Sequence, residues 1–271
     1  MNFSVLLSVY VKEKPSFLKT ALYSIFEGQT LKPNEIVLVQ DGPLTSELEK
    51  VIYDYKNTHP DTLKLVVLEN NKGLALALNS GLKECTNELI ARMDTDDIST
   101  SDRFQKQVSF LNKNKEIDVV GTYISEINEN DKIIKEQVKF PLTHKELVVF
   151  FKKRDPIAHP TSMFRKSFFE KAGNYKSDLH LAEDTLLWYH GFLNNCKFAN
   201  IDYVGLKFRR TEDFYKRRAD RKKTFQLFKF RVNVINRNLK YGFKANVFAF
   251  CYLCMSLSPS LIKKIVYKIL R

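Results

Sequence analysis

Short apolar runs alternate along the first hundred residues with segments whose apolar positions recur at helical spacing. The runs have the length and the Val, Ile and Leu content of buried strands, and they cover residues 3–10, 34–42, 63–70 and 88–93. The segments between them place apolar side chains three and four positions apart, and they cover residues 15–29, 46–57 and 74–84. This alternation predicts βαβ units, and hence an α/β fold with a mostly parallel sheet flanked by helices on both faces.

The pattern is less regular after residue 93. We expect a helix over 101–114, a strand pair or hairpin edge over 117–127, and a helix over 181–195 with two acids in its first turn. The stretch "DPIAHPTS" (155–162) contains two prolines and predicts an irregular loop, which a helix should follow.

Positive charge is concentrated near the C-terminus. The 271 residues include 44 basic and 31 acidic side chains, a net charge of +13, and residues 207–271 alone hold 18 basic and three acidic ones. The segment 259–271 separates apolar from mostly basic side chains on two halves of a helix, and the apolar run 247–257 is too short to span a bilayer. We therefore expect a domain of residues 1–220 and a basic, helical extension, 221–271, that associates with an anionic membrane surface. A terminal helix docked on the domain is the alternative.

The N-terminal and cysteine patterns indicate the compartment. The chain begins without the basic start or the cleavage site of a signal peptide, and its four cysteines do not form a disulfide framework. We expect a cytoplasmic protein, peripherally associated with the inner face of the cell membrane. Cys251 and Cys254 form a CxxC without a second pair, so they are expected to be small, buried side chains rather than zinc ligands.

Acidic residues follow two of the expected strands. Asp94, Asp96 and Asp97 come directly after the fourth strand, and Asp41 ends the second. Ligands of α/β sheets bind outside the carboxyl ends of the strands, so these acids and the end of the first strand are expected at one edge. Carboxylates this close repel one another unless a cation lies among them.

The absence of phosphate-binding loops favours a metal as that cation. Neither GxGxxG nor GxxxxGK[ST] is present, and "DTDD" lacks the further ligands and the central Gly of an EF-hand. The D-x-D therefore predicts Mg²⁺ or Mn²⁺ held by Asp94 and Asp96, with substrate phosphates on the metal. A solvated acidic turn before the next helix is the alternative.

Several motifs, in order, resemble the family 2 glycosyltransferases with the GT-A fold, in particular the bacterial branch that builds O-antigen and exopolysaccharide repeats. The resemblance covers roughly residues 1–220 and is carried by "SVLLSVYVKEKPSFLKTALYSIFEGQTLKPNEIVLVQDG", "NNKGLALALNSGL", "IARMDTDDIS", "DRFQKQVSFL", "AHPTSMFRK", "LAEDTLLW" and "KFRRTEDFYKRR". It implies a Rossmann-like, mostly parallel mixed sheet, a UDP-sugar donor and a Mn²⁺ or Mg²⁺ cofactor.

The resemblance also implies a role for single residues in donor binding. The positions expected to hold the base, the ribose and the metal-bound diphosphate, or to flank them, are Ser8, Val9, Tyr10, Asp41, Arg92, Asp94, Asp96 and Arg103. Many relatives carry a late Arg-x-His segment near the phosphates, whereas this chain has "FRRTED". The residues expected to do that electrostatic work instead are Arg209, Arg210 and Arg218.

The acceptor side has its own expected residues. The family's E-D pair is here Glu183 and Asp184, and the resemblance implies Asp184 as the general base. The histidine of "IAHPTS", His159, is expected either to line the acceptor side or to pack in its loop. Trp188 is expected in the core.

The implied reaction is an inverting transfer. A hexose, with glucose or galactose favoured, would move from a UDP-sugar to a hydroxyl of a lipid-linked, polyprenyl diphosphate saccharide and form a β-linkage. A sugar nucleotidyltransferase is an alternative, but the expected Gly-rich loop after the first strand is missing from "VYVKEKPSF". Nucleic acid is not expected as a partner of the basic segment 215–231, because such a partner leaves the D-x-D unexplained.

Overall fold

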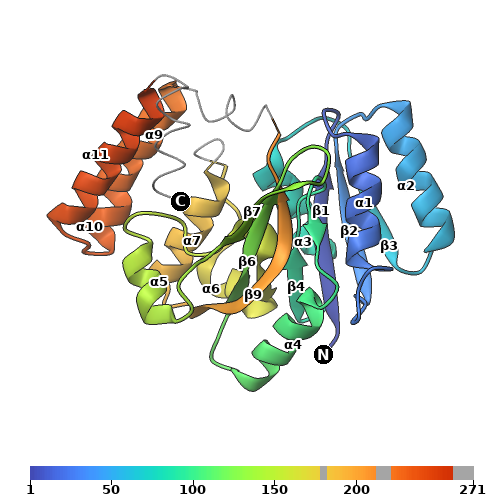
Figure 1. The fold of residues 1–271 in the computed structure, drawn as a ribbon, viewed down its shortest axis with the longest axis horizontal. Helices are drawn as coiled ribbons and strands as arrows, with labels where there is room; N and C mark the ends of the chain where they lie inside the picture. Colours follow the sequence, from blue (N-terminus) through green and yellow to red (C-terminus); the bar gives the residue numbers. More distant parts are fainter. Residues whose placement is uncertain (178–181, 212–220, 259–271) are drawn as a thin grey trace.

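The N-terminal half has the predicted alternation of strands and helices (Figure 1). The computed structural model describes residues 1–177, 182–211 and 221–258. Its first strands lie parallel in the order β3-β2-β1-β4; they are β1 (Phe3–Val9), β2 (Glu35–Asp41), β3 (Leu63–Leu68) and β4 (Leu89–Arg92). The connecting helices are α1 (Pro15–Ile25), α2 (Ser46–Thr58) and α3 (Leu74–Glu84). The predicted parallel sheet is confirmed.

Apolar side chains cover both faces of this sheet. Val5 and Leu7 of β1 point into one core, which α1, α2 and α4 (Arg103–Lys113) complete, whereas Leu6 points into a second core shared with α3. Successive strand residues face opposite sides. A continuous apolar run is therefore what a strand buried on both faces requires, and this is why the run was readable from sequence.

The second half extends the sheet with strands of mixed direction. Within the described residues the sheet has nine strands, in the order β3-β2-β1-β4-β8-β6-β9-β5, with β7 paired to β6. The added strands are β5 (Ile98–Ser99), β6 (Val119–Ile127), β7 (Ile133–Val138), β8 (Met163–Arg165) and β9 (Phe198–Arg209). The segment 117–127, expected as a strand pair or hairpin edge, holds one strand, β6, which forms a hairpin with β7 and lies inside the sheet between β8 and β9. The long β9 was not predicted, although apolar residues occupy every second position from Val204 to Arg209.

Helices of the second half pack beside the sheet, and the C-terminal ones lie at the end of the molecule opposite α1 and α2 (Figure 1). They are α5 (His144–Phe150), η1 (His159–Thr161), α6 (Lys166–Ala172), α7 (Glu183–Leu193), α9 (Arg221–Phe230), the π-helical turn η2 (Arg231–Ile235), α10 (Asn236–Asn238) and α11 (Phe243–Leu257). No helix among the described residues has the length and apolar content that crossing a bilayer requires.

The C-terminal helices are attached to the body by buried contacts. Ile235, Tyr241 and Ala245 belong to the same core as α3 and α7, and Arg231 donates to the Phe151 carbonyl oxygen over 2.7 Å. The predicted boundary at residue 220 and the predicted helix at 259–271 both lie outside the described residues. The division into residues 1–220 and 221–271 therefore stays a prediction.

The expectation that Cys251 and Cys254 are buried is wrong. Both are exposed, because α11 contacts the body through a different stripe of side chains, Ala245, Ala249 and Leu253. The apolar run was readable from sequence, but the face that it buries was not.

Candidate active site

Three carboxylates gather where the central strands end. The loop from Met93 to Asp97 leaves β4 and enters β5, which pairs antiparallel with β9. Ligand oxygens of Asp94, Asp96 and Asp97 all lie within 4.8 Å of one another. These three acids therefore lie together at the carboxyl edge of the sheet, as predicted.

Asp97 is the buried carboxylate of this cluster, so its charge is the least favourable of the three. It is buried, and one carboxylate oxygen accepts a hydrogen bond from the backbone N–H of Arg209 over 2.8 Å. The second oxygen is buried without a hydrogen-bond partner. Burial, followed by the charges of Asp96 and Asp94, raises the pKa of the Asp97 carboxyl well above its usual value. Close carboxylate oxygens, one of them buried and unpartnered, fit a divalent cation such as Mg²⁺ or Mn²⁺.

Arg92 supplies positive charge beside the cluster. Its guanidinium forms an ion pair with Asp94, and it is almost fully buried at the end of β4. Arg103 lies behind it on α4, fully buried, and donates to the Arg92 carbonyl oxygen over 2.7 Å. The expectation that Arg103 flanks the D-x-D as a donor contact does not match this placement. Arg103 supports the strand end from within the core.

Three buried aromatic side chains, His159, Tyr175 and Trp188, lie together near Arg92. His159 makes a 2.8 Å hydrogen bond with the hydroxyl of Tyr175, and its ring packs against Trp188, which is in the core as expected. Burial, with Arg92 adding to it, lowers the pKa of His159 well below its usual value, so the imidazole is neutral. His159 is only 6% exposed and packs within the protein rather than lining an open surface.

The predicted base lies at the first turn of α7. Glu183 and Asp184 are half-buried, and an Asp184 carboxylate oxygen accepts the backbone N–H of Thr185 over 2.7 Å. Burial raises the pKa of Tyr175, and the charges of Glu183, Asp184 and Asp94 raise it further. The same tyrosine therefore feels the acids of α7 and of the D-x-D loop, which indicates that the structure brings these two parts of the sequence together.

Asp41 has a different immediate partner from the expected one. Its two carboxylate oxygens accept the backbone N–H groups of Lys72 and Gly73 over 2.7 and 3.0 Å. Asp41 thus fixes the loop after β3. The other residues expected around the base and ribose, Ser8, Val9 and Tyr10, end the neighbouring strand β1, with Ser8 and Tyr10 half-buried and Val9 buried.

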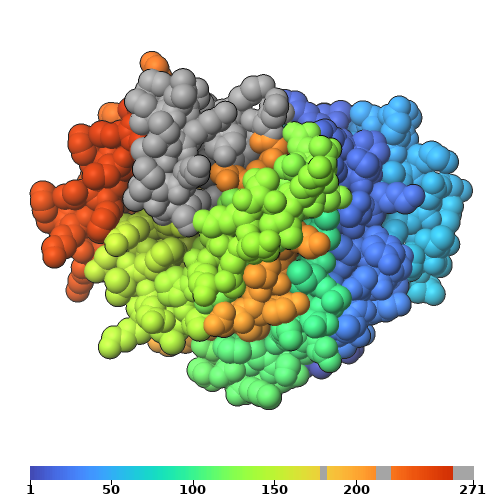
Figure 2. All heavy atoms as spheres, viewed as in Figure 1, coloured from blue at the N-terminus to red at the C-terminus, as the bar shows by residue number. Residues whose placement is uncertain are grey.

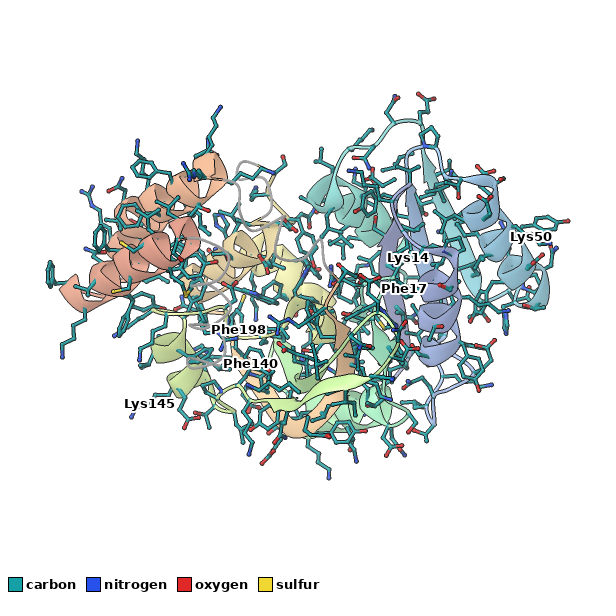
Figure 3. All side chains as sticks on the ribbon, turned by 45° about the horizontal axis from the view of Figure 1, so that its top comes forward. Lys14, Phe17, Lys50, Phe140, Lys145 and Phe198 are labelled. Carbon is teal, nitrogen blue, oxygen red and sulfur yellow. The ribbon has the colours of Figure 1, made fainter. Side chains whose placement is uncertain are left out.

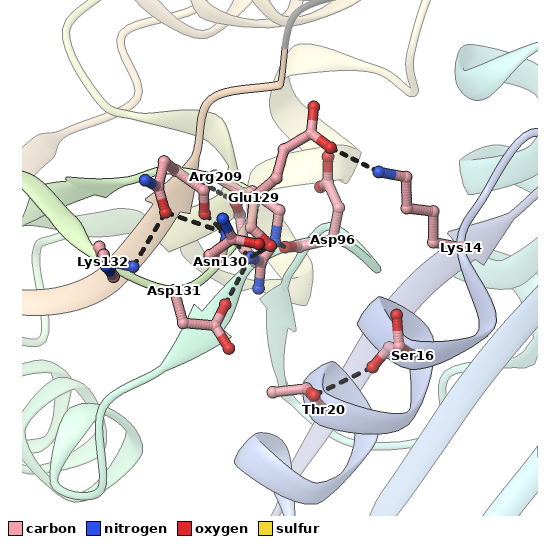
Figure 4. A network of polar contacts seen from close by, with 11 residues as sticks. Lys14, Ser16, Thr20, Asp96, Glu129, Asn130, Asp131, Lys132 and Arg209 are labelled. Atoms are coloured by element: carbon pink, nitrogen blue, oxygen red, sulfur yellow. Dashed lines mark hydrogen bonds and ion pairs between the residues drawn. The ribbon is translucent and has the colours of Figure 1, made fainter.

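Arg209 holds the acidic loop in place (Figure 4). Its Nε donates to the Asp96 carbonyl oxygen over 2.6 Å, and its Nη1 donates to the Asn128 carbonyl oxygen over 3.1 Å and pairs with Asp131 at 2.5 Å. The guanidinium also lies 4.0 Å from the ring centroid of Phe17. The expectation that Arg209 acts on the phosphates does not fit a side chain that is buried and engaged in this way. Arg209 is a positioning residue.

The other late arginines are placed differently. Arg210 pairs with the buried Glu126 of β6 at 2.7 Å, and Arg218 lies outside the described residues. The expected phosphate contacts of Arg210 and Arg218 stay predictions.

Sequence reasoning missed two parts of this edge. The first is the turn between β6 and β7. Lys14, at the start of α1, holds this turn by a 2.5 Å ion pair with Glu129, and Lys14 and Phe17 lie together in Figure 3. Figure 2 shows the hairpin at the surface beside β9 and the N-terminal segment. The second is Glu13, which accepts the Thr95 hydroxyl over 2.7 Å. Burial is the main cause of the raised pKa of Glu13, and the charge of Asp94 adds to it. An acid in the loop after the first strand was the available signal.

Comparisons with known proteins agree with this geometry. A family model described as glycosyl transferase family 2 matches residues 4–173. The chain is 39% identical over 217 residues to the amylovoran biosynthesis glycosyltransferase AmsE of Erwinia amylovora, covering 80% of this chain and 79% of that one. It is 34% identical over 220 residues to the UDP-Gal:alpha-D-GlcNAc-diphosphoundecaprenol beta-1,3-galactosyltransferase of Escherichia coli, covering 80% and 78%.

Solved structures share the fold. TarS 1–349 of S. aureus in complex with UDP-GlcNAc superimposes with a TM-score of 0.62 at 19% identity, covering 97% of this chain and 83% of that one. The mannosyltransferase PcManGT from Pyrobaculum calidifontis in complex with GDP-Man and Mn²⁺ superimposes with a TM-score of 0.64 at 16% identity, covering 98% and 79%. The predicted GT-A fold is confirmed.

Proposed function

This chain belongs to glycosyl transferase family 2, and from that premise we propose that it transfers a hexose from a UDP-sugar to a lipid-linked saccharide in bacterial surface polysaccharide synthesis. The observation that carries the proposal is the group of three carboxylates within 4.8 Å at the carboxyl edge of the sheet. Glucose or galactose is the proposed sugar. A relative named for a UDP-Gal donor and a diphosphoundecaprenol-linked acceptor supports the choice of both substrates.

The residues at this edge divide the work of an inverting transfer. Asp94 and Asp96 would hold Mn²⁺ or Mg²⁺, which when bound neutralises the charge that grows on the departing diphosphate. Arg92 adds positive charge beside Asp94 and, being buried, loses little of its effect to solvent. The end of β1, with Ser8 and Tyr10, offers the place for the base and ribose, and Asp41 at the end of β2 fixes the loop beside it.

Asp184 takes the acceptor proton in this proposal. A sugar hydroxyl must lose its proton as it attacks, and a carboxylate within hydrogen-bond reach provides general-base help of about 10²–10⁴-fold. The Thr185 N–H holds one oxygen of the Asp184 carboxylate and so orients it. Attack opposite to the leaving diphosphate, with a single base, inverts the anomeric centre and forms a β-linkage from an α-linked donor.

The place of the protein follows from the acceptor. A polyprenyl diphosphate saccharide is confined to a membrane, so we propose that the enzyme works on the inner face of the cell membrane, held there peripherally by its basic C-terminal residues.

A panel of sugar nucleotides, assayed with Mn²⁺ and a lipid-linked acceptor, tests the function. We expect transfer from one UDP-hexose, and Asp96→Ala should abolish both transfer and the metal-dependent binding of UDP. A rise in melting temperature with UDP and Mn²⁺, but not with UTP or DNA, separates this function from a nucleotidyltransferase or a nucleic-acid-binding protein. Release of pyrophosphate from a nucleoside triphosphate and a sugar phosphate would refute the proposal.

A further inference from the structure

The outward face of α11 is apolar along its whole length. The helix rests on the body through three side chains spaced four apart, Ala245, Ala249 and Leu253. At 3.6 residues per turn, an arc of about 120° on the solvent side of the helix holds six exposed apolar or sulfur-bearing side chains: Phe243, Val247, Phe250, Cys251, Cys254 and Leu257. This arc is the outward face of α11, and the exposed Lys244 borders it. Phe243 is 80% exposed and Phe250 is 56% exposed. A contiguous exposed apolar face of this kind marks a docking surface.

The same part of the chain carries positive charge without any negative charge. Residues 221–258 contain eight Lys and Arg side chains and no Asp or Glu. Helix α9 packs against α11 through Phe228 and Phe250, whose ring centroids are 6.4 Å apart, and exposes Arg221 and Lys222 in its first turn. Lys153, from the segment after α5, places its ammonium group 4.6 Å from the ring centroid of Phe248. Cations therefore lie around an apolar strip.

This combination indicates what the face binds. An anionic bilayer offers head groups to the cations and acyl chains to the aromatic rings. A second copy of this chain would bring the same acid-free segment opposite itself, and like charges would oppose that pairing. The helix has 15 residues, which is about 22 Å and too short to cross a hydrocarbon core of about 30 Å. Contact with a bilayer would therefore place the helix in the plane of the membrane surface.

We propose that the outward face of α11 inserts into the head-group region of an anionic membrane, with the cations of α9 on the lipid phosphates. The surface is formed by described residues alone. The inference rests on the proposed function only in that a lipid-linked acceptor requires a membrane. The pair α9–α11 forms one end of the molecule in Figure 1, opposite α1 and α2.

Vesicle binding by the full-length chain tests the proposal. Vesicles of phosphatidylglycerol and phosphatidylcholine are sedimented with the wild type, with F243S/F250S, and with the control Y23S/Y53S, whose two tyrosines are 60% and 67% exposed on α1 and α2. Each lost Phe should weaken partition by about tenfold or more. The control should bind as the wild type does. Wild-type binding should also fall as salt rises or as phosphatidylglycerol is withdrawn.

Two results would overturn the inference. The first is unchanged partition of F243S/F250S, provided that circular dichroism melting shows the variant folded. The second is a concentration-dependent dimer of the wild type, without lipid, that F243S/F250S abolishes, because the face would then bind a second copy. No sugar nucleotide is present in these measurements, so a failure of the proposed transferase activity cannot be mistaken for a failure of the membrane surface.

Discussion

Arg209→Lys tests whether the end of β9 positions the D-x-D loop. The wild-type guanidinium bridges the D-x-D loop and the turn between β6 and β7. Its Nε donates to the Asp96 carbonyl oxygen over 2.6 Å, and its Nη1 donates to the Asn128 carbonyl oxygen over 3.1 Å. A lysine keeps the charge but offers a single nitrogen at the end of a flexible stem, so it cannot hold both carbonyl groups in the same geometry.

The structure sets the size of the effect. One hydrogen bond from a charged donor is lost, worth about 1.5–3 kcal/mol in the free energy of unfolding. The ion pair to Asp131 adds little, because that carboxylate is 56% exposed and screened by solvent. Loosening the backbone at Asp96 should also weaken Mn²⁺ binding by about tenfold or more, as loss of groups that orient metal ligands does.

Two measurements separate folding from site geometry. Urea unfolding, followed by the fluorescence of the buried Trp188, gives the loss of stability. Titration calorimetry of Mn²⁺ in the presence of UDP gives the metal affinity. The matched control is Arg165→Lys, because Arg165 also bridges buried carbonyl groups, those of Ile117 and Leu111 over 2.8 and 2.6 Å. Arg165 lies opposite Leu89 at the start of β4, whereas the D-x-D follows the end of that strand. The control should lose similar stability and keep its Mn²⁺ affinity.

Equal losses of stability in both lysine variants, with wild-type Mn²⁺ binding in both, would refute a positioning role of Arg209 at the D-x-D loop. The Asp96 loop would then be held by its other contacts, including the backbone bond from Arg209 to Asp97, and the guanidinium would have a purely structural role.

Three further predictions follow from the site and the tail. Asp184→Asn should keep the affinity for UDP and Mn²⁺ but lower the transfer rate by about 10²–10⁴-fold, which steady-state kinetics with separate donor-binding measurements can check; normal turnover would remove Asp184 as the base. Because the folded-state pKa of His159 is lowered, the unfolded chain binds one more proton than the folded chain, and the free energy of unfolding should fall as pH drops below about 6.5. His159→Gln should flatten this pH dependence, which urea unfolding at several pH values measures. An unchanged dependence of the free energy of unfolding on pH in the variant would contradict this prediction. Lys263→Gln with Lys264→Gln should weaken binding to phosphatidylglycerol vesicles by about 30-fold, at roughly 1 kcal/mol per lysine, and unchanged partition would argue against a role for the segment 259–271.

Local pattern was enough to predict the first half of the molecule. A strand buried on both faces must be apolar throughout, and a helix that covers it must be apolar at every third or fourth position. Both requirements are visible within one element, so β1 to β4 and α1 to α3 were readable. The acids Asp94 and Asp96 were locatable for the same reason, since a strand end fixes the edge on which they lie.

Only the tertiary structure decided what the same side chains contact. Arg209 and Asp41 are charged residues at positions where a ligand contact was expected. In the structure Arg209 donates to the Asp96 carbonyl oxygen, and Asp41 accepts the backbone N–H groups after β3. Cys251 and Cys254 lie in an apolar run, yet the run turns them outward. The physical reason is that periodicity reports how a segment divides its own faces. Which neighbour occupies a face depends on pairings such as β5 with β9, between residues more than a hundred positions apart, and no local pattern encodes them.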